Sequence, residues 1–175
     1  MFQLPPDCVE PIFSAVLGYW EGKRRDGKLP TRREIDPLDL GGTILPYILL
    51  FEVVPAEAPA TTGPRFRFRL AGTAFRQIAG RDVTGLCFDE LGPAERTAPV
   101  IRQLTMTVEQ LRPAYLVGRV TARSDAHEDI GRLALPLSSD GASVDKILGV
   151  WITMPLAADA AVSPFEGVPR LLDGD

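Results

Sequence analysis

Cysteine and histidine are scarce in this chain of 175 residues, which contains only Cys8, Cys87 and His127. Two cysteines cannot form a disulfide framework, and their spacing is not that of a Cys-x-x-Cys metal site. A neutral imidazole can ligate haem iron or act as a base. However, His127 lies in the polar segment SDAHED, which is typical of an exposed hairpin loop rather than of a pocket. We therefore expect neither a metal site nor haem.

Long apolar segments are also missing. No stretch approaches the roughly 20 apolar residues that span a bilayer. Pro5, Pro6 and Asp7 interrupt the N-terminus where a signal peptide would need an apolar run. The net charge is −4, whereas a nucleic-acid partner requires a basic face. We therefore expect a cytoplasmic protein that binds neither membranes nor nucleic acids.

Common catalytic motifs are absent as well. The chain has no Gly-x-Ser-x-Gly elbow and no Gly-Lys-Ser/Thr phosphate loop. Paired carboxylates can perform acid–base catalysis, and the candidates for this role are Asp36, Asp39, Asp82, Asp89 and Glu90. Each lies beside an expected helix start or turn, where capping explains an acid without chemistry. We therefore predict that the protein is not an enzyme.

The residues that are present predict one domain with a sizeable core, because 45% of them are hydrophobic and 24% are charged. The stretch from Arg65 to Ala71 alternates strictly. Phe66, Phe68 and Leu70 are expected on one side and arginines on the other, which is the pattern of a half-buried strand.

Short segments separated by glycines follow this strand. Thr73 is a suitable N-cap for a short helix, and Gly80 is placed to end that helix in the left-handed conformation. A second short apolar segment follows Gly85. Such segments cannot form a regular layer, so we expect them to bend over one face of a sheet and to leave a small apolar chamber beneath.

Other elements are expected on both sides of this stretch. An N-terminal amphipathic helix is indicated by apolar residues at helical spacing: Val9, Ile12, Phe13, Val16, Leu17 and Trp20. A long helix is predicted to open at Pro99 and to end before Pro113. Further strands are predicted at 47–54, 114–122, 128–138 and 144–154, the last two joined by a Ser-Ser-Asp-Gly turn.

Several short motifs occur in a characteristic order between about residue 15 and residue 154. They are Tyr19-Trp20, Leu29-Pro30, Ile35-Asp36-Pro37, Phe68-Arg69-Leu70 with Gly72-Thr73, Gly80-Arg81-Asp82 with Thr84-Gly85, and Leu135-Pro136-Leu137-Ser138 with Asp140-Gly141. In this order and spacing the chain resembles the PAS sensory fold, and in particular the single-domain bacterial PAS family known mostly from alphaproteobacteria.

The resemblance implies an α+β fold with a five-stranded antiparallel sheet in the spatial order 2-1-5-4-3 and helices on one face, plus the N-terminal amphipathic helix. We expect an N-terminal helix and arm at 1–26, a PAS-like domain at 27–156 and a flexible tail at 157–175. The resemblance also implies a sensory or regulatory role in signal transduction. Without an output domain of its own, the chain would act through a signalling partner or through dimerisation.

Apolar residues of the expected helix-covered face and of the segments above it are candidates for the wall of a ligand pocket. They are Phe66, Phe68, Leu70, Phe75, Ile78, Leu86, Phe88, Leu104, Val108, Leu135 and Trp151. The same residues could simply fill the core. Two hypotheses follow, a sensor of a small apolar ligand and a protein–protein interaction adaptor with a filled core. A cavity with convergent polar groups would favour the sensor.

Cys87 invites comparison with the photoreactive cysteine of flavin-binding light sensors, whose motif resembles Gly-Arg-Asn-Cys-Arg-Phe-Leu-Gln. In this chain the cysteine is one residue closer to the glycine, and the final strand offers Trp151 and Thr153 instead of the polar residues that hold flavin. We therefore predict a buried structural thiol and no covalent flavin. The identity of any other cofactor stays open.

The apolar face of the N-terminal helix is wide for a helix that covers only its own sheet. Burying one such side chain contributes roughly 1.5–3 kcal/mol, so several are not expected to stay in water. We therefore predict a homodimer through this helix, with packing of the helix on its own sheet as the alternative.

Overall fold

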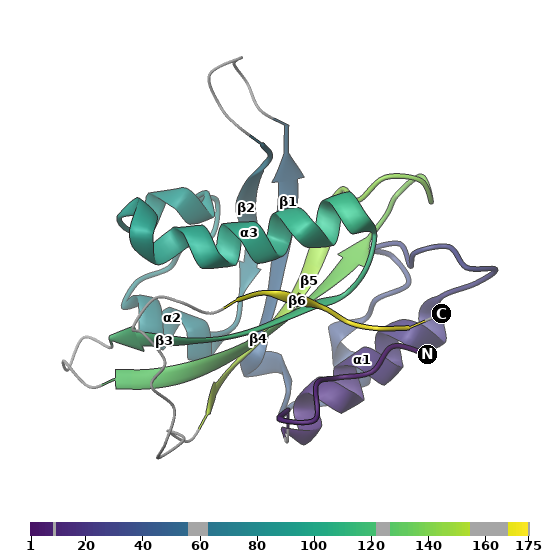
Figure 1. Cartoon of the computed structure of the whole chain (residues 1–175), viewed down its shortest axis with the longest axis horizontal. Coiled ribbons are helices and arrows are strands. Elements are labelled where there is room, and N and C mark those ends of the chain that lie inside the picture. The colour runs from purple at the N-terminus through teal and green to yellow at the C-terminus, as the bar shows by residue number, and fades with distance from the viewer. Residues whose placement is uncertain (9, 56–62, 122–126, 155–167, 175) are drawn as a thin grey trace.

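One antiparallel sheet organises the computed structural model, which describes residues 1–8, 10–55, 63–121, 127–154 and 168–174. Its strands lie in the order β2-β1-β5-β4-β3-β6 (Figure 1). Their bounds are β1 Ile48–Val54, β2 Arg65–Ala71, β3 Ala114–Thr121, β4 His127–Leu137, β5 Lys146–Met154 and β6 Arg170–Leu171. The α+β class and the order 2-1-5-4-3 of the first five strands are confirmed.

In these described ranges, three α-helices and three short 3₁₀ segments, labelled η, accompany the sheet. Their bounds are α1 Pro11–Lys23, η1 Pro37–Leu40, η2 Leu45–Tyr47, α2 Thr73–Ala79, η3 Phe88–Glu90 and α3 Ala94–Gln110. Within the described ranges, none of the helices combines the length and the apolar character that a membrane crossing requires.

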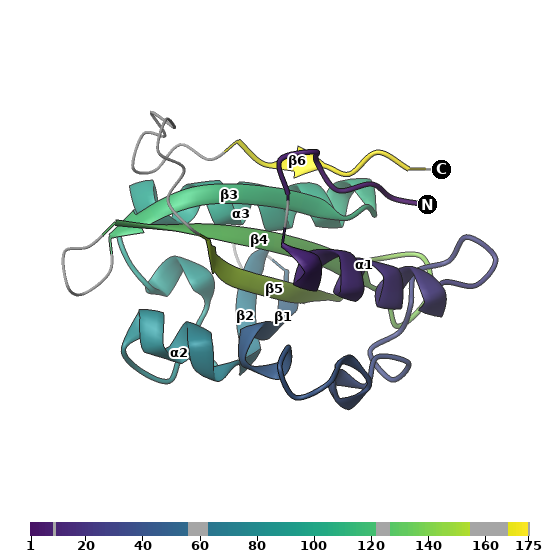
Figure 2. The ribbon, with the colours of Figure 1, turned by 90° about the horizontal axis from the view of Figure 1, so that it is seen from below.

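The two central strands are covered on both faces. Arg132 of β4 and Trp151 of β5 are register partners and face α2 and α3. The alternate residues face α1, which lies against β4 (Figure 2). Phe13 of α1 meets the Tyr115 ring edge-on at 5.5 Å between ring centroids. A Cβ added at Gly131 would come within 2.9 Å of the Phe13 ring, so this glycine permits the close approach of α1.

The apolar face of α1 is buried inside the chain itself. Phe13, Val16, Leu17 and Trp20 are all buried, and the Trp20 indole nitrogen donates a hydrogen bond of 2.9 Å to the Pro136 carbonyl. Ile12 is half-buried, and Val9 lies outside the described residues. Packing of α1 on its own sheet, the alternative noted above, is therefore what the structure shows. The reason for expecting a homodimer through this helix no longer holds.

Strand β2 departs from the predicted alternation at one point. Phe51 is the register partner of Phe68, whereas Leu50 is the partner of Leu70, which leaves Arg69 without a partner in a β-bulge. Phe66 and Phe68 face the helices as predicted, but the extra residue turns Leu70 outward, where it is 37% exposed. The prediction that Leu70 shares their face is wrong, because a two-residue period cannot reveal an inserted residue.

The helix starts also differ from expectation. The N-cap of α2 is Gly72 rather than Thr73, and a Cβ at Gly72 would lie 2.1 Å from the Pro46 carbonyl oxygen. Gly80 ends α2 at φ +69°, as predicted. Helix α3 begins at Ala94, so that Pro99 lies inside the helix rather than opening it.

The last described segment is not a free tail. β6 pairs with β3, Leu172 is buried, and Gln3 forms a bridge with Asp173. The expectation of a flexible tail is therefore wrong for residues 170–173, which pack on their own chain. Residues 157–167 and 175 of the predicted tail lie outside the described residues.

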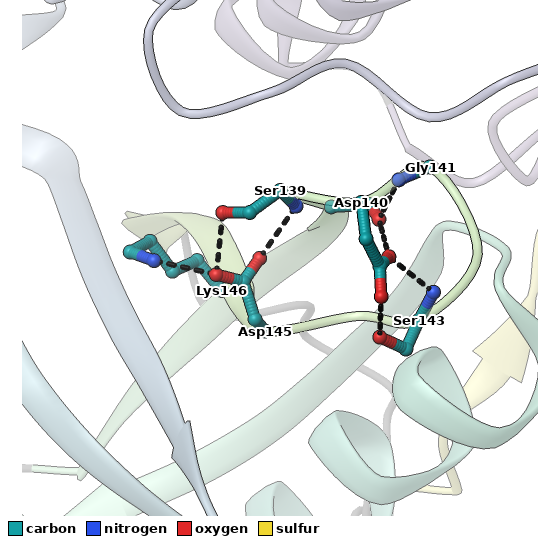
Figure 3. A network of polar contacts seen from close by, with 7 residues as sticks. Ser139, Asp140, Gly141, Ser143, Asp145 and Lys146 are labelled. Carbon is teal, nitrogen blue, oxygen red and sulfur yellow. Dashed lines mark hydrogen bonds and ion pairs between the residues drawn. The ribbon is translucent and has the colours of Figure 1, made fainter.

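The connection between β4 and β5 is held by two carboxylates (Figure 3). Asp140 accepts hydrogen bonds from the backbone N–H groups of Ala142 and Ser143 at 2.8 and 2.9 Å. Asp145 accepts hydrogen bonds from the Ser139 N–H and hydroxyl groups at 3.0 and 2.7 Å. Gly141 adopts φ +77°, as the predicted Ser-Ser-Asp-Gly turn requires.

We predict that Phe68→Ala lowers the free energy of unfolding by about 3–5 kcal/mol, because Phe68 is fully buried. The matched variant Leu70→Ala should cost less than about 1 kcal/mol, because Leu70 lies on the outer face of β2. Urea denaturation of both variants measures the difference. Equal costs would contradict the bulge at Arg69.

The β4–β5 connection should be sensitive to acid. Hydrogen bonds from Ser143 and Ala142 hold the pKa of Asp140 well below its usual range. A carboxyl group whose pKa is lower in the folded state than in the unfolded state stabilises the fold at pH values above the unfolded-state pKa of about 3.9. This stabilisation is lost as the pH falls through the folded-state pKa. Asp140→Asn should therefore lower the urea midpoint at pH 7, and the difference from the wild type should shrink below about pH 4. A difference that is the same at pH 7 and in strong acid would contradict this account.

Candidate ligand cavity

An internal cavity of about 200 Å³ lies between the sheet and the segments that cover it. Its walls come from α2, from η3, from the first turns of α3, and from β3, β4 and β5. A single water needs about 10–15 Å³, and drug-sized ligands occupy about 300–1,000 Å³. The cavity is therefore suited to a small ligand.

Aromatic side chains form one wall of the cavity. The rings of Phe75 and Phe88 approach Trp151 with centroid distances of 5.0 and 5.7 Å. Behind them, Phe68 stacks on Phe75 at 5.4 Å and packs against Phe51 at 4.7 Å. Because these rings support one another, the aromatic wall is a preformed surface for an apolar group.

Arg132 faces this wall from β4. Its guanidinium lies 4.8 Å from the Trp151 ring centroid, and the residue is only 5% exposed. Nη1 donates a hydrogen bond of 3.2 Å to the Ile130 carbonyl, whereas the buried Nε has no partner. Burial lowers the pKa of Arg132 to about 10, so the side chain still carries its positive charge at neutral pH.

Neighbouring residues make room for Arg132 and fix its strand. A Cβ at Gly118 would lie 3.0 Å from Nη1 of Arg132, so the missing side chain leaves space for the guanidinium. The buried Gln103 of α3 donates from Nε2 to the carbonyls of Ala114 and Arg132 at 2.9 and 3.1 Å. These bonds tie α3 to β3 and β4 beside the cavity.

The charge of the cavity is opposite to that of the whole chain. Among the described residues, its lining includes Arg81, Arg96 and Arg132 and no carboxylate, although the chain has a net charge of −4. Arg81 and Arg96 are exposed and mark where the cavity meets solvent. The described lining therefore combines apolar walls with positive charge.

Four of the residues predicted for the pocket line the cavity, namely Phe75, Ile78, Phe88 and Trp151. The other predicted residues lie elsewhere. Phe66, Phe68 and Leu104 are buried in the core outside the lining, Leu86 and Val108 are half-buried outside it, Leu70 is exposed, and Leu135 is buried on the α1 face of the sheet.

Sequence reasoning missed Arg132, a buried charged residue that lines the cavity from β4. A signal was present, because this arginine is the one charged residue in the otherwise apolar run from Ile130 to Leu137. A charge is seldom placed in such a run unless it is paired or functional.

Cys87 does not line the cavity. Burial raises the pKa of its thiol, which makes the thiol less reactive.

Among the described residues, the side chains of Cys87, Asp89 and Glu90 bring possible metal ligands within 4.8 Å of one another. However, Asp89 pairs with Arg65 at 2.9 Å, and Glu90 accepts a hydrogen bond of 2.5 Å from the Cys87 N–H. These contacts account for the group. His127 is the first residue of β4.

The sheet order, the short covering segments and the internal cavity together define a PAS-like sensory domain. A family model described as a PAS domain matches residues 10–152. The chain therefore belongs to the PAS domain family, whose members are in general sensory or regulatory signalling modules. Searches of curated proteins and of solved structures found no significant match.

We predict that purified protein shows no visible absorption band that bleaches under illumination through Cys87, because the thiol lies outside the cavity lining. Absorption spectra of the wild type and of Cys87→Ala, recorded before and after blue light, measure this. A bleaching band in the wild type that is lost in Cys87→Ala would overturn the structural role of the thiol.

Proposed function

We propose that the domain is a sensor that binds a small molecule in the cavity and passes the signal to a partner protein, with no catalysis of its own. The observation that carries this proposal is the cavity of about 200 Å³ that has an aromatic wall and a buried arginine, Arg132, in its lining. A core that served packing alone would be expected to fill such a space.

The alternative function, an interaction adaptor with a filled core, fits less well. It requires the outer face of the sheet as a binding surface. Part of that face, over β4, is occupied by α1, with Phe13 against Tyr115 and Trp20 bonded to the Pro136 carbonyl. The cavity also supports a ligand-binding role over a filled core.

Helix α3 offers a route by which an occupied cavity could change the surface. Pro99 has no N–H, so the Glu95 carbonyl has no backbone donor one turn later. The turn before Pro99 therefore lacks one backbone hydrogen bond and is less stable than the rest of the helix. Thr97 and Val100 line the cavity on either side of Pro99. A ligand that contacts both the sheet and this turn would favour one arrangement of the turn and could alter the surface that a partner reads.

We predict that native mass spectrometry of freshly purified protein detects a bound small molecule, and that Ile78→Trp removes it by filling the cavity. Ile78 is half-buried and lines the cavity. The matched control is Ile101→Trp, because Ile101 is also half-buried but does not line the cavity. The control should keep the ligand at an overpacking cost of about 1–3 kcal/mol. The sensor function would be overturned by two results together: a wild-type mass equal to that of the polypeptide alone, and no binding of any compound from a small-molecule library.

A further inference from the structure

Arg132 carries a positive charge that has few partners among the described residues. A guanidinium carries five N–H donors. In the described part of the chain it makes one side-chain hydrogen bond, to Ile130 of its own strand, and no ion pair involves it. This hydrogen bond stays within β4, so it connects no second element of the fold.

Burial without a counterion is unfavourable for such a group. A charge inside a protein is usually paired or hydrogen-bonded, because its hydration is lost. The Trp151 ring at 4.8 Å offsets part of this loss through a cation–π contact. Because Arg132 lines the cavity and only one of its donors is used within the described residues, the guanidinium has donors left for a molecule in the cavity.

A carboxylate matches these donors. Its two oxygens accept parallel hydrogen bonds from the planar guanidinium fork. The arginines at the rim, Arg81 and Arg96, add a positive field that attracts anions toward the opening. One buried guanidinium balances one negative charge, so a phosphate dianion would leave its second charge against apolar walls.

The rest of the cavity defines the other end of the ligand. Phe75, Phe88 and Trp151 present rings to one side of the space, and Leu116 and Ile130 contribute aliphatic surface from β3 and β4. A volume of about 200 Å³ accommodates a small apolar body rather than a long acyl chain.

We propose that the cavity binds a small organic monocarboxylate, with its carboxylate on the Arg132 guanidinium and its apolar body against Phe75, Phe88 and Trp151. This inference rests on the proposed sensor function and names the chemical class of its ligand.

The test compares acids with their neutral amides. Isothermal titration calorimetry is performed with benzoate, phenylacetate and hexanoate, and with benzamide, phenylacetamide and hexanamide. A hydrogen bond to a charged group corresponds to roughly 10- to 100-fold in affinity. We therefore expect at least one acid to bind, with a preference of this size over its amide.

Three variants connect this preference to Arg132. Arg132→Met removes the charge and keeps an apolar chain, and should abolish the preference for the acid. Arg132→Lys keeps the charge but loses the planar fork, and should give an intermediate preference. The matched control Arg102→Met removes one positive charge from an exposed position of α3 that does not line the cavity, and should bind like the wild type.

The outcomes separate this inference from the sensor function. Amides that bind as tightly as their acids, or an acid preference that survives in Arg132→Met, would overturn the carboxylate class and leave a ligand-binding cavity. Absence of binding by every acid would also overturn it. Absence of binding by every compound, together with a bare chain mass in native mass spectrometry, would overturn both. If Arg132→Met fails to fold, the acid–amide comparison in the wild type decides.

Discussion

Burial of β4 and β5 on both faces is the constraint that places every other element. From Ile130 to Leu137 and from Ile147 to Ile152 every residue is buried, so each face of these strands needs a cover. Helix α1 covers one face, and α2, η3 and α3 cover the other. Short segments cannot close over a sheet as evenly as one long helix, and the cavity lies under the side that they cover.

The same constraint explains why Arg132 is informative. A side chain that points inward from β4 has no route to water except through the cavity, and this one carries a charge. Gly118 leaves space for the guanidinium, and Gln103 donates a hydrogen bond to the Arg132 carbonyl. The local structure is thus arranged around a group that contributes little to folding, which is the usual mark of a binding site.

Much of the fold could be predicted from the sequence, because alternating and helical patterns report burial directly. The face of Phe66 and Phe68 and the face of Trp151 followed from a two-residue period. Leu70 did not, since the bulge at Arg69 leaves no trace in that period. Leu135 was misplaced because a strand buried on both faces shows no alternation. The predicted pocket does not include Arg132, because an apolar pattern identifies only apolar lining residues.

The central claim, that the cavity holds a small molecule against Arg132, is tested most directly by a crystal structure of protein purified without added ligand. The account predicts density that belongs to no residue of the chain, in contact with the aromatic wall and within hydrogen-bonding distance of the Arg132 guanidinium. A cavity closed by its own side chains, with Arg132 paired to a carboxylate of the chain, would contradict it.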